Sequence, residues 1–371
     1  MNAPKLRFKG FNNKWEENKL NNLFSIRSSS DLKQNELSKI YSDIYCYPVY
    51  GNSISNEGLM GYYPYYEETA PALTVTGRGV NIGTPFYRNT NFNAIGRLLV
   101  LYPLDNNYDS YFFGLEISRF SIFTETTGVP QLTAPAIGNY KVWYPVPQEQ
   151  KKISNFFLNL NKKIQLQQEK IDLLKLQKKG LMQKIFSQEL RFKDENGQEY
   201  PEWREKNLEE LCNINTGNKD TQNKIEGGLY PFFVRSQVIE RISTYSFDGE
   251  AILTAGDGVG VGKVFHYING KFDYHQRVYM LSDFKDCIGK YIYYYFTQNF
   301  MKEAMKYNAK TSVDSVRREM LTKMMFPYPF IEEQQKIADF LSATDLKISM
   351  ESQKLEQLQF QKQAFMQQMF I

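Results

Sequence analysis

The sequence predicts an α+β protein made by internal duplication, in which two variable domains are separated by two long helices. A lysine-rich segment at 149–186 recurs without a gap at 333–370, a shift of 184 residues. Apolar side chains in both copies follow the 3.5-residue spacing of a coiled coil, and the stretches between them contain short strand-like runs. We therefore expect mixed α/β domains, mostly of short strands with a few helices, and two helices paired as an antiparallel coiled coil about a pseudo-two-fold axis.

Composition places the chain among cytoplasmic proteins large enough for two or more domains. It has 371 residues, of which 42% are hydrophobic. No apolar run approaches the roughly 20 residues of a membrane span, and the first residues lack a secretory signal. Cys46, Cys212 and Cys287 lie far apart without a CxxC pattern, which is typical of a reduced compartment. With two histidines in the whole chain, the sequence predicts neither a metal site nor a histidine-based catalytic site.

The repeat extends beyond the helices to the start of each half. The tetrapeptide LRFK occurs at 6–9 and 190–193, and Trp15 matches Trp203. The chain is therefore a duplication of two units, 1–186 and 187–371. The second LRFK directly follows the first helix, whereas the first LRFK has no helix before it and the second helix has no LRFK after it. The order therefore resembles a ring of two units cut between them, and we expect the two termini to lie close in space.

Four segments follow from this repeat. We expect a first variable domain at 1–147, a central helix at 148–188, a second variable domain at 189–331 and a C-terminal helix at 332–371. Prolines just before each helix support these boundaries. Within the variable domains, the strand-like runs that we single out are 72–76, 98–102, 251–254 and 278–281.

Each long helix carries an apolar seam that needs a partner, and the nearest partner of equal length is the other copy. Polar residues interrupt the two seams at equivalent places, Gln167 with Glu351 and Lys178 with Lys362. The first copy has six excess positive charges and the second one excess negative charge, within a net charge of +4 for the chain. The predicted seam residues are Ile153, Phe157, Leu160, Ile164, Ile171, Leu174, Leu181, Ile337, Leu341, Ile348, Leu355, Leu358 and Phe365.

Each variable domain contains a glycine-rich stretch, GRGVNIG at 77–83 and GDGVGVG at 256–262. The second fits neither a dinucleotide-binding GxGxxG nor a Walker A loop. We favour a tight turn between strands, and the alternative is a loop that approaches a ligand closely. Arg97 and Arg277 follow at equivalent positions, which favours a shared structural role. Hydrogen-bond donors suited to DNA bases and phosphates are Arg78, Asn81, Arg88, Asn89, Lys263, His275, Gln276, Arg277, Lys310, Arg317 and Arg318.

The helix entries carry a resemblance to a known family. YPVPQEQKKISNFF at 144–157 matches YPFIEEQQKIADFL at 328–341, and LRFK followed by Trp opens each unit. In order and spacing, the whole chain resembles the specificity (S) subunit of type I restriction-modification systems. The resemblance implies two target-recognition domains, each reading one half of a bipartite, asymmetric site in double-stranded DNA. It also implies that the helices space these domains and dock two methyltransferase (M) subunits, which restriction (R) subunits join.

The same resemblance implies no catalytic residue and no cofactor on this chain. S-adenosylmethionine would serve adenine methylation on the M subunits, and ATP and Mg²⁺ would serve the R subunits. Two alternatives stay open. One is a stand-alone DNA-modifying enzyme with the helices as a dimerisation element, which the lack of catalytic motifs disfavours. The other is a coiled-coil scaffold that makes no contact with DNA.

Overall fold

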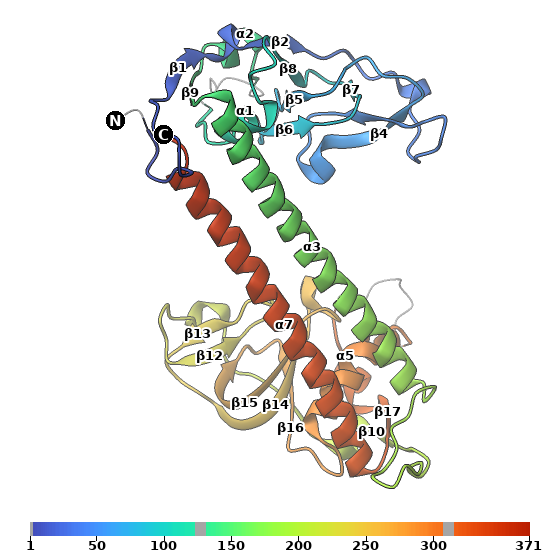
Figure 1. The fold of residues 1–371 in the computed structure, drawn as a ribbon. Helices are drawn as coiled ribbons and strands as arrows, with labels where there is room; N and C mark the ends of the chain where they lie inside the picture. Colours follow the sequence, from blue (N-terminus) through green and yellow to red (C-terminus); the bar gives the residue numbers. More distant parts are fainter. Residues whose placement is uncertain (1–2, 123–130, 307–314) are drawn as a thin grey trace. The chain divides into compact units, whose positions relative to one another are not determined.

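The computed structural model describes residues 3–122, 131–306 and 315–371 (Figure 1). The chain divides into two compact units. Unit 1 comprises Met1–Gln167 with Lys354–Ile371, and unit 2 comprises Gln168–Gln353. Both boundaries fall inside the long helices α3 (Pro147–Phe186) and α7 (Ile331–Gln368), so each unit holds part of both.

In its described residues, unit 1 contains three sheets, two short α-helices and three short 3-10 helices, besides its parts of α3 and α7. The strand orders are β1-β9, β2-β8-β5-β6 and β4-β3-β7. The elements are β1 (Glu16–Lys19), η1 (Leu20–Asn22), β2 (Phe24–Ser28), η2 (Gln34–Glu36), β3 (Tyr47–Tyr50), η3 (Ser55–Gly58), β4 (Leu59–Tyr63), β5 (Ala72–Val75), β6 (Pro85–Arg88), β7 (Asn93–Ala94), β8 (Leu99–Pro103), α1 (Ser110–Ile117), α2 (Ala134–Gly138) and β9 (Lys141–Tyr144).

Unit 2 contains a two-stranded sheet, β10-β17, and a six-stranded sheet, β11-β16-β14-β15-β12-β13. The elements are β10 (Arg204–Asn207), α4 (Leu208–Leu211), β11 (Asn213–Thr216), η4 (Thr221–Asn223), β12 (Tyr230–Phe233), β13 (Glu240–Ile242), β14 (Phe247–Ala255), η5 (Gly258–Gly260), β15 (Phe265–Tyr274), β16 (Val278–Ser282), α5 (Gly289–Met305), α6 (Arg318–Thr322) and β17 (Met325–Tyr328). The mixed helix and strand content predicted from sequence is confirmed, and the four strand-like runs lie in β5, β8, β14 and β16.

The two variable domains have the same topology although their sequences differ. The order β2-β8-β5-β6 in unit 1 corresponds to β11-β16-β14-β15 in unit 2. β3 pairs in parallel with β7, and β12 pairs in parallel with the last residues of β15. The difference is that β15 is one continuous strand, whereas the equivalent strand of unit 1 is interrupted between β6 and β7.

A buried ion pair fixes the start of each long helix. Glu149 and Glu333 are fully buried. Arg7 Nη2 lies 2.5 Å from Glu149 Oε2, and Arg191 Nη2 lies 2.6 Å from Glu333 Oε2. A carboxylate in the first turn also complements the positive end of the helix dipole. The LRFK motif therefore supplies the counter-charge for the glutamate that begins each helix.

The glutamine that follows each of these glutamates bonds to the segment just before the helix. The Nε2 of Gln150 donates to the carbonyl of Pro145 at 2.8 Å, and Gln334 donates to Pro329 at 2.9 Å. Proline has no backbone N–H and so cannot extend the strand ladder as a donor. Its carbonyl still needs a hydrogen-bond donor, and the glutamine side chain supplies one. The repeated sequence thus forms the same local structure twice.

The two ends of the chain meet in unit 1 (Figure 1). The backbone N–H of Leu6 donates to the carbonyl of Gln368 at 2.9 Å. In unit 2 the equivalent bond joins Leu190 to Lys184 at 3.0 Å, where the chain is continuous. The expectation that the termini lie close in space is confirmed.

The described burial follows the predicted helical period. Each predicted seam residue is buried or half-buried, whereas apolar residues off the seam, such as Leu173 and Leu176, are exposed. Within unit 1, the rings of Phe156 and Phe365 lie 4.9 Å apart. None of the described helices is long and apolar enough to cross a membrane.

Candidate nucleic-acid interface

The glycine-rich stretches form loops at equivalent places, between β5 and β6 in unit 1 and between β14 and β15 in unit 2. A Cβ at Gly77 would lie 2.6 Å from the carbonyl oxygen of Arg97, and a Cβ at Gly256 would lie 2.8 Å from that of Arg277. Both positions need glycine because the backbones approach so closely. Arg97 and Arg277 therefore occupy the same place in the two units, next to the loop.

Two arginines of unit 2 converge on one carboxylate beside its loop. Arg235 Nη1 lies 2.7 Å from Asp257 Oδ1, and Arg277 Nη1 lies 3.6 Å from Asp257 Oδ2. The Arg277 side chain is 64% exposed. Since a guanidinium has five N–H donors, each arginine is oriented by Asp257 and still has donors to offer a ligand.

Gln276 and His275, which precede Arg277, differ in exposure and in the contacts they make. Gln276 is exposed, and its Nε2 donates to Asp220 at 3.0 Å. His275 is buried, and its Nδ1 accepts the backbone N–H of Arg277 at 2.9 Å. Burial, followed by the charge of Arg235, lowers the pKa of His275. A neutral imidazole that holds the backbone of Arg277 is a framework residue, and a direct DNA contact does not fit this placement.

A third segment of unit 2 reaches the same loop. The backbone of Val316 donates to the carbonyl of Gly256 at 2.8 Å, which places Arg317 and Arg318 at this end of the domain. Both arginines are exposed at the start of α6, and Lys263 is exposed on the loop itself. The structure thus brings together the predicted donors of unit 2, except for Lys310, which lies outside the described residues.

The predicted donors of unit 1 are not all brought together. Arg78 and Asn81 are exposed on the loop at the start of β6. Arg88 and Asn89 lie at the other end of β6, roughly 10 Å away along a strand. Asn89 is exposed and lines a cavity with residues of α1 and α3, away from the loop.

Arg88 is an internal residue of unit 1. Its side chain is 2% exposed. Its Nε donates to Thr74 at 2.9 Å, its Nη2 donates to the carbonyl of Glu57 at 2.7 Å, and its guanidinium lies 3.5 Å from the ring centre of Tyr50. Burial lowers its pKa. The prediction of a DNA contact by Arg88 does not fit this placement, because its donors are committed inside the domain.

Sequence reasoning missed three residues beside the loops. Asn52 follows β3 and Arg235 follows β12, each two residues past the strand. In unit 1 the Oδ1 of Asn52 accepts the backbone N–H of Gly77 at 2.7 Å. The sequences around Asn52 and Arg235 are unlike, so only the pairing of the strands shows that the two residues occupy equivalent positions. Asp257 was visible in the glycine-rich stretch, but a search for donors passes over a carboxylate.

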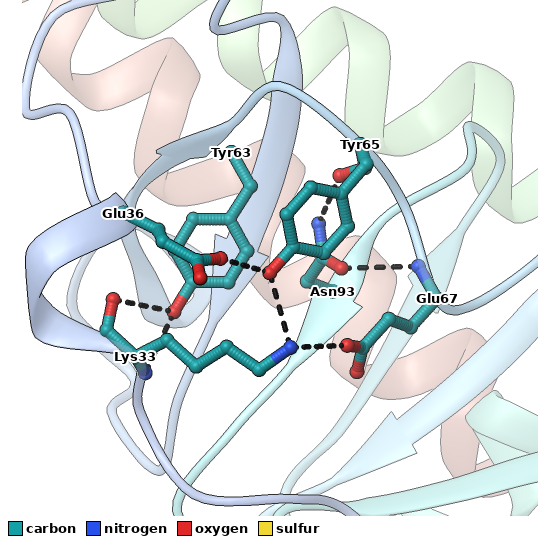
Figure 2. Close-up of polar contacts among 6 residues, drawn as sticks. All are labelled: Lys33, Glu36, Tyr63, Tyr65, Glu67 and Asn93. Atoms are coloured by element: carbon teal, nitrogen blue, oxygen red, sulfur yellow. Dashed lines mark hydrogen bonds and ion pairs between the residues drawn. The ribbon is translucent and has the colours of Figure 1, made fainter.

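A polar network supports the long loop that precedes β3 in unit 1. Figure 2 shows the Lys33 ammonium donating to Glu67 at 3.0 Å and to the hydroxyl of Tyr65 at 3.1 Å. Tyr65 in turn donates to Glu36, and Asn93 donates to the carbonyl of Tyr65 at 2.8 Å. The hydrogen bonds to Glu67 and Tyr65 raise the pKa of Lys33. The network ties this loop to β7 and to the segment after β4.

Comparison with known proteins identifies the family. The model of the "Type I restriction modification DNA specificity domain" matches residues 12–176 and 200–359. The chain belongs to this family. The resemblance found in the sequence is thereby confirmed, and the two matched segments correspond to the two halves of the duplication.

Specificity subunits are also found among individual relatives. The chain is similar to the type I restriction enzyme EcoDI specificity subunit of Escherichia coli, with 26% identity over 42% of this chain and 34% of that subunit. It is 25% identical to the MjaVIII specificity subunit of Methanocaldococcus jannaschii, over 71% of this chain and 69% of that one. The chain thus spans about a third of the first relative's length and about two thirds of the second's.

Two solved structures share the fold. The S subunit of a type I restriction-modification system from M. genitalium has a TM-score of 0.70 and 16% identity, with coverage of 100% of this chain and 99% of that chain. A second chain, from a study of assembly and conformational transition of a type I system, has a TM-score of 0.54 and 13% identity, with coverage of 95% and 96%. At these identities the likeness concerns the fold alone.

Proposed function

We propose that this protein is the DNA-recognition subunit of a type I restriction-modification complex, and that each unit reads one half of a bipartite, asymmetric site. One observation carries the proposal. The two units present the same loop on the same strands, but the side chains around it differ. Asn52, Arg78 and Arg97 in unit 1 stand where Arg235, Asp257 and Arg277 stand in unit 2. One scaffold with two different sets of polar groups suits two unlike half-sites.

The groups of unit 2 suit direct readout in the major groove. An arginine that a carboxylate holds in place can bind guanine O6 and N7 in bidentate fashion, and Arg235 and Arg277 are both held by Asp257. Exposed Lys263, Arg317 and Arg318 suit contacts with phosphates, which position the domain without reading sequence. Gln276 is exposed beside them and is a candidate for hydrogen bonds to adenine.

The groups of unit 1 are less constrained. The side chains of Arg78 and Arg97 are exposed and have no hydrogen bond or ion pair with any described residue. Asn81 is exposed between them and β6. These groups are available to pair with bases or phosphates. Among the described residues no carboxylate holds them in the way that Asp257 holds the arginines of unit 2, which distinguishes the two proposed half-sites.

We assign the long helices to spacing and assembly. An antiparallel coiled coil of α3 and α7, related by a pseudo-two-fold axis, would set the separation of the half-sites. It is supported by the burial of the predicted seam residues and, within unit 2, by the ion pairs Lys178–Asp345 and Lys170–Glu351. Two M subunits dock on this element in our proposal, and R subunits join them. The corresponding domain boundaries are 1–147, 148–188, 189–331 and 332–371.

Catalysis belongs to the partner subunits in this proposal. S-adenosylmethionine binds the M subunits, and ATP and Mg²⁺ bind the R subunits, in the cytoplasm where the DNA is. This chain contributes no catalytic residue. It selects the site at which adenine becomes accessible to the methyltransferase, a step that costs unstacking energy.

An exchange of recognition domains tests the proposal. Residues 24–147 are replaced by those of another family member, the complex with M subunits is expressed, and methylated adenines are mapped by sequencing. We expect one half-site to change while the other stays. Exchanging 212–331 is the matched control and should change the other half-site.

Two outcomes would contradict the proposal. An unchanged methylation motif after the first exchange would favour a scaffold that does not contact DNA. Methyl transfer by the purified chain without M subunits, above background, would favour the alternative of a stand-alone enzyme.

A further inference from the structure

A valine stands at the tip of each glycine-rich loop and packs against little else. Val80 is 96% exposed and Val259 is 93% exposed, the two highest values among the large apolar side chains of the described residues. They occupy equivalent places, directly after Gly79 and Gly258. A single exposed valine needs no explanation, but the same residue at the tip of both loops does.

The two loops turn at equivalent glycines. Gly79 has a φ of 90° and Gly258 a φ of 73°, a left-handed conformation that valine or any β-branched residue would adopt only under strain. No atom lies within 4 Å of a Cβ built at either glycine. Together with the exposure of Val80 and Val259, this shows that the tip of each turn has open space around it.

Internal hydrogen bonds hold both loops in shape. In unit 1, Gly83 donates to the carbonyl of Thr76 at 2.8 Å, and the hydroxyl of Thr84 donates to the carbonyl of Asn81 at 2.9 Å. In unit 2, Val264 donates to the carbonyl of Gly260 at 2.9 Å, and Thr254 donates to the carbonyl of Val264 at 3.0 Å. A loop fixed before binding loses little entropy when it meets a ligand.

The surroundings of each valine are polar. Arg78 and Asn81 flank Val80, whereas Asp257 with its two arginines and Lys263 flank Val259. The flanking residues differ between units, so no common polar partner explains the valine. The two loop tips share a short apolar side chain that is flanked by hydrogen-bond donors suited to DNA.

We infer that Val80 and Val259 contact the 5-methyl group of a thymine in the major groove, one in each half-site. The inference rests on the proposed function. Apolar side chains distinguish thymine from cytosine through this methyl group. Valine is too short to act as the intercalating wedge for which larger apolar side chains are used. Every half-site that contains an adenine to be methylated also offers a thymine on the opposite strand.

The test uses the complex with M subunits and duplexes in which each thymine of the mapped target is replaced singly by deoxyuridine. We expect one replacement in each half-site to weaken binding about fourfold, equivalent to about 0.8 kcal/mol for one buried methyl group. Val259→Ser should abolish the effect of deoxyuridine in the half-site read by unit 2 and leave the other effect intact. Val80→Ser is the matched control and should do the reverse.

The outcomes separate the inference from the proposed function. Sequence-specific binding that no deoxyuridine weakens would overturn the inference alone. A deoxyuridine effect that persists in both variants would also overturn it. Binding without sequence specificity by the unaltered complex would overturn the proposed function and the inference with it. Both valines are exposed, so the variants should fold like the parent, which their circular dichroism checks.

Discussion

The two units build the same framework, but they differ in how much of it is hydrogen-bonded. In unit 2, Glu333 accepts from Arg191 and also from the indole N–H of Trp203, at 3.2 Å. In unit 1, Glu149 accepts from Arg7, while the indole nitrogen of Trp15 is buried without a hydrogen-bond partner among the described residues. The ion pair is common to both units and the tryptophan bond is not. The ion pair is therefore the part that the helix start requires.

The surroundings of the two glycine-rich loops differ more than the two helix starts do. Strand order and the close approach of the loop glycine to the next strand are the same. The side chains that surround the loop change in type and even in charge, as Arg78 and Asp257 show. Backbone geometry is thus retained where it positions the loop, and chemistry varies where a ligand would be read.

Removing the buried carboxylate should have the largest effect. Glu333→Ala leaves Arg191 without its counter-charge and Trp203 without its acceptor, and we expect a loss of about 4 kcal/mol in the free energy of unfolding. Glu149→Ala should cost about 1 kcal/mol less, because among the described residues Glu149 accepts no hydrogen bond from Trp15. Urea denaturation measures both. Equal losses would show that the Trp203 bond contributes nothing.

A tryptophan analogue isolates that single bond. A benzothiophene analogue has nearly the shape of tryptophan and no N–H. At Trp203 it should lower the free energy of unfolding by about 1.5 kcal/mol, since the lost bond goes to a charged acceptor. At Trp15 it should be neutral or slightly stabilising, because it removes an unpaired buried donor. A comparable loss at Trp15 would mean that its N–H has a partner, such as a buried water.

The sequence predicted the parts of this comparison that depend on pattern. The repeat, the long helices, the four strands β5, β8, β14 and β16 and the meeting of the termini all follow from spacing and order. The common topology of the variable stretches could not be predicted, because strand pairing depends on backbone hydrogen bonds and tolerates many side chains. Arg88 and His275 illustrate the same limit at the candidate site. Residue type marks both as donors, but burial inside the domain decides how they act.

A lysine pair gives the smallest and most informative difference. In unit 2, Lys178 Nζ lies 2.5 Å from Asp345. The equivalent residues of unit 1 are Lys362 and Asn161, which line a cavity of about 900 Å³. Burial lowers the pKa of Lys362 below its usual 10.5. We expect Lys178→Met to destabilise the protein by about 1 kcal/mol, because Asp345 loses its ion-pair partner and, among the described residues, keeps only the hydrogen bond from Tyr294. Lys362→Met should stabilise it by roughly 0.5 kcal/mol.

The pH dependence distinguishes this cause from simple packing. Between the lowered pKa of folded Lys362 and 10.5, the unfolded chain binds more protons than the folded one, so stability rises with pH. The advantage of Lys362→Met should therefore shrink as pH rises through this window. Asn161→Asp would supply the carboxylate that unit 2 already has, and it should remove the advantage at neutral pH. Thermal unfolding from pH 7 to pH 10 measures both effects. An advantage of Lys362→Met that is independent of pH would assign the difference between the units to packing rather than to charge.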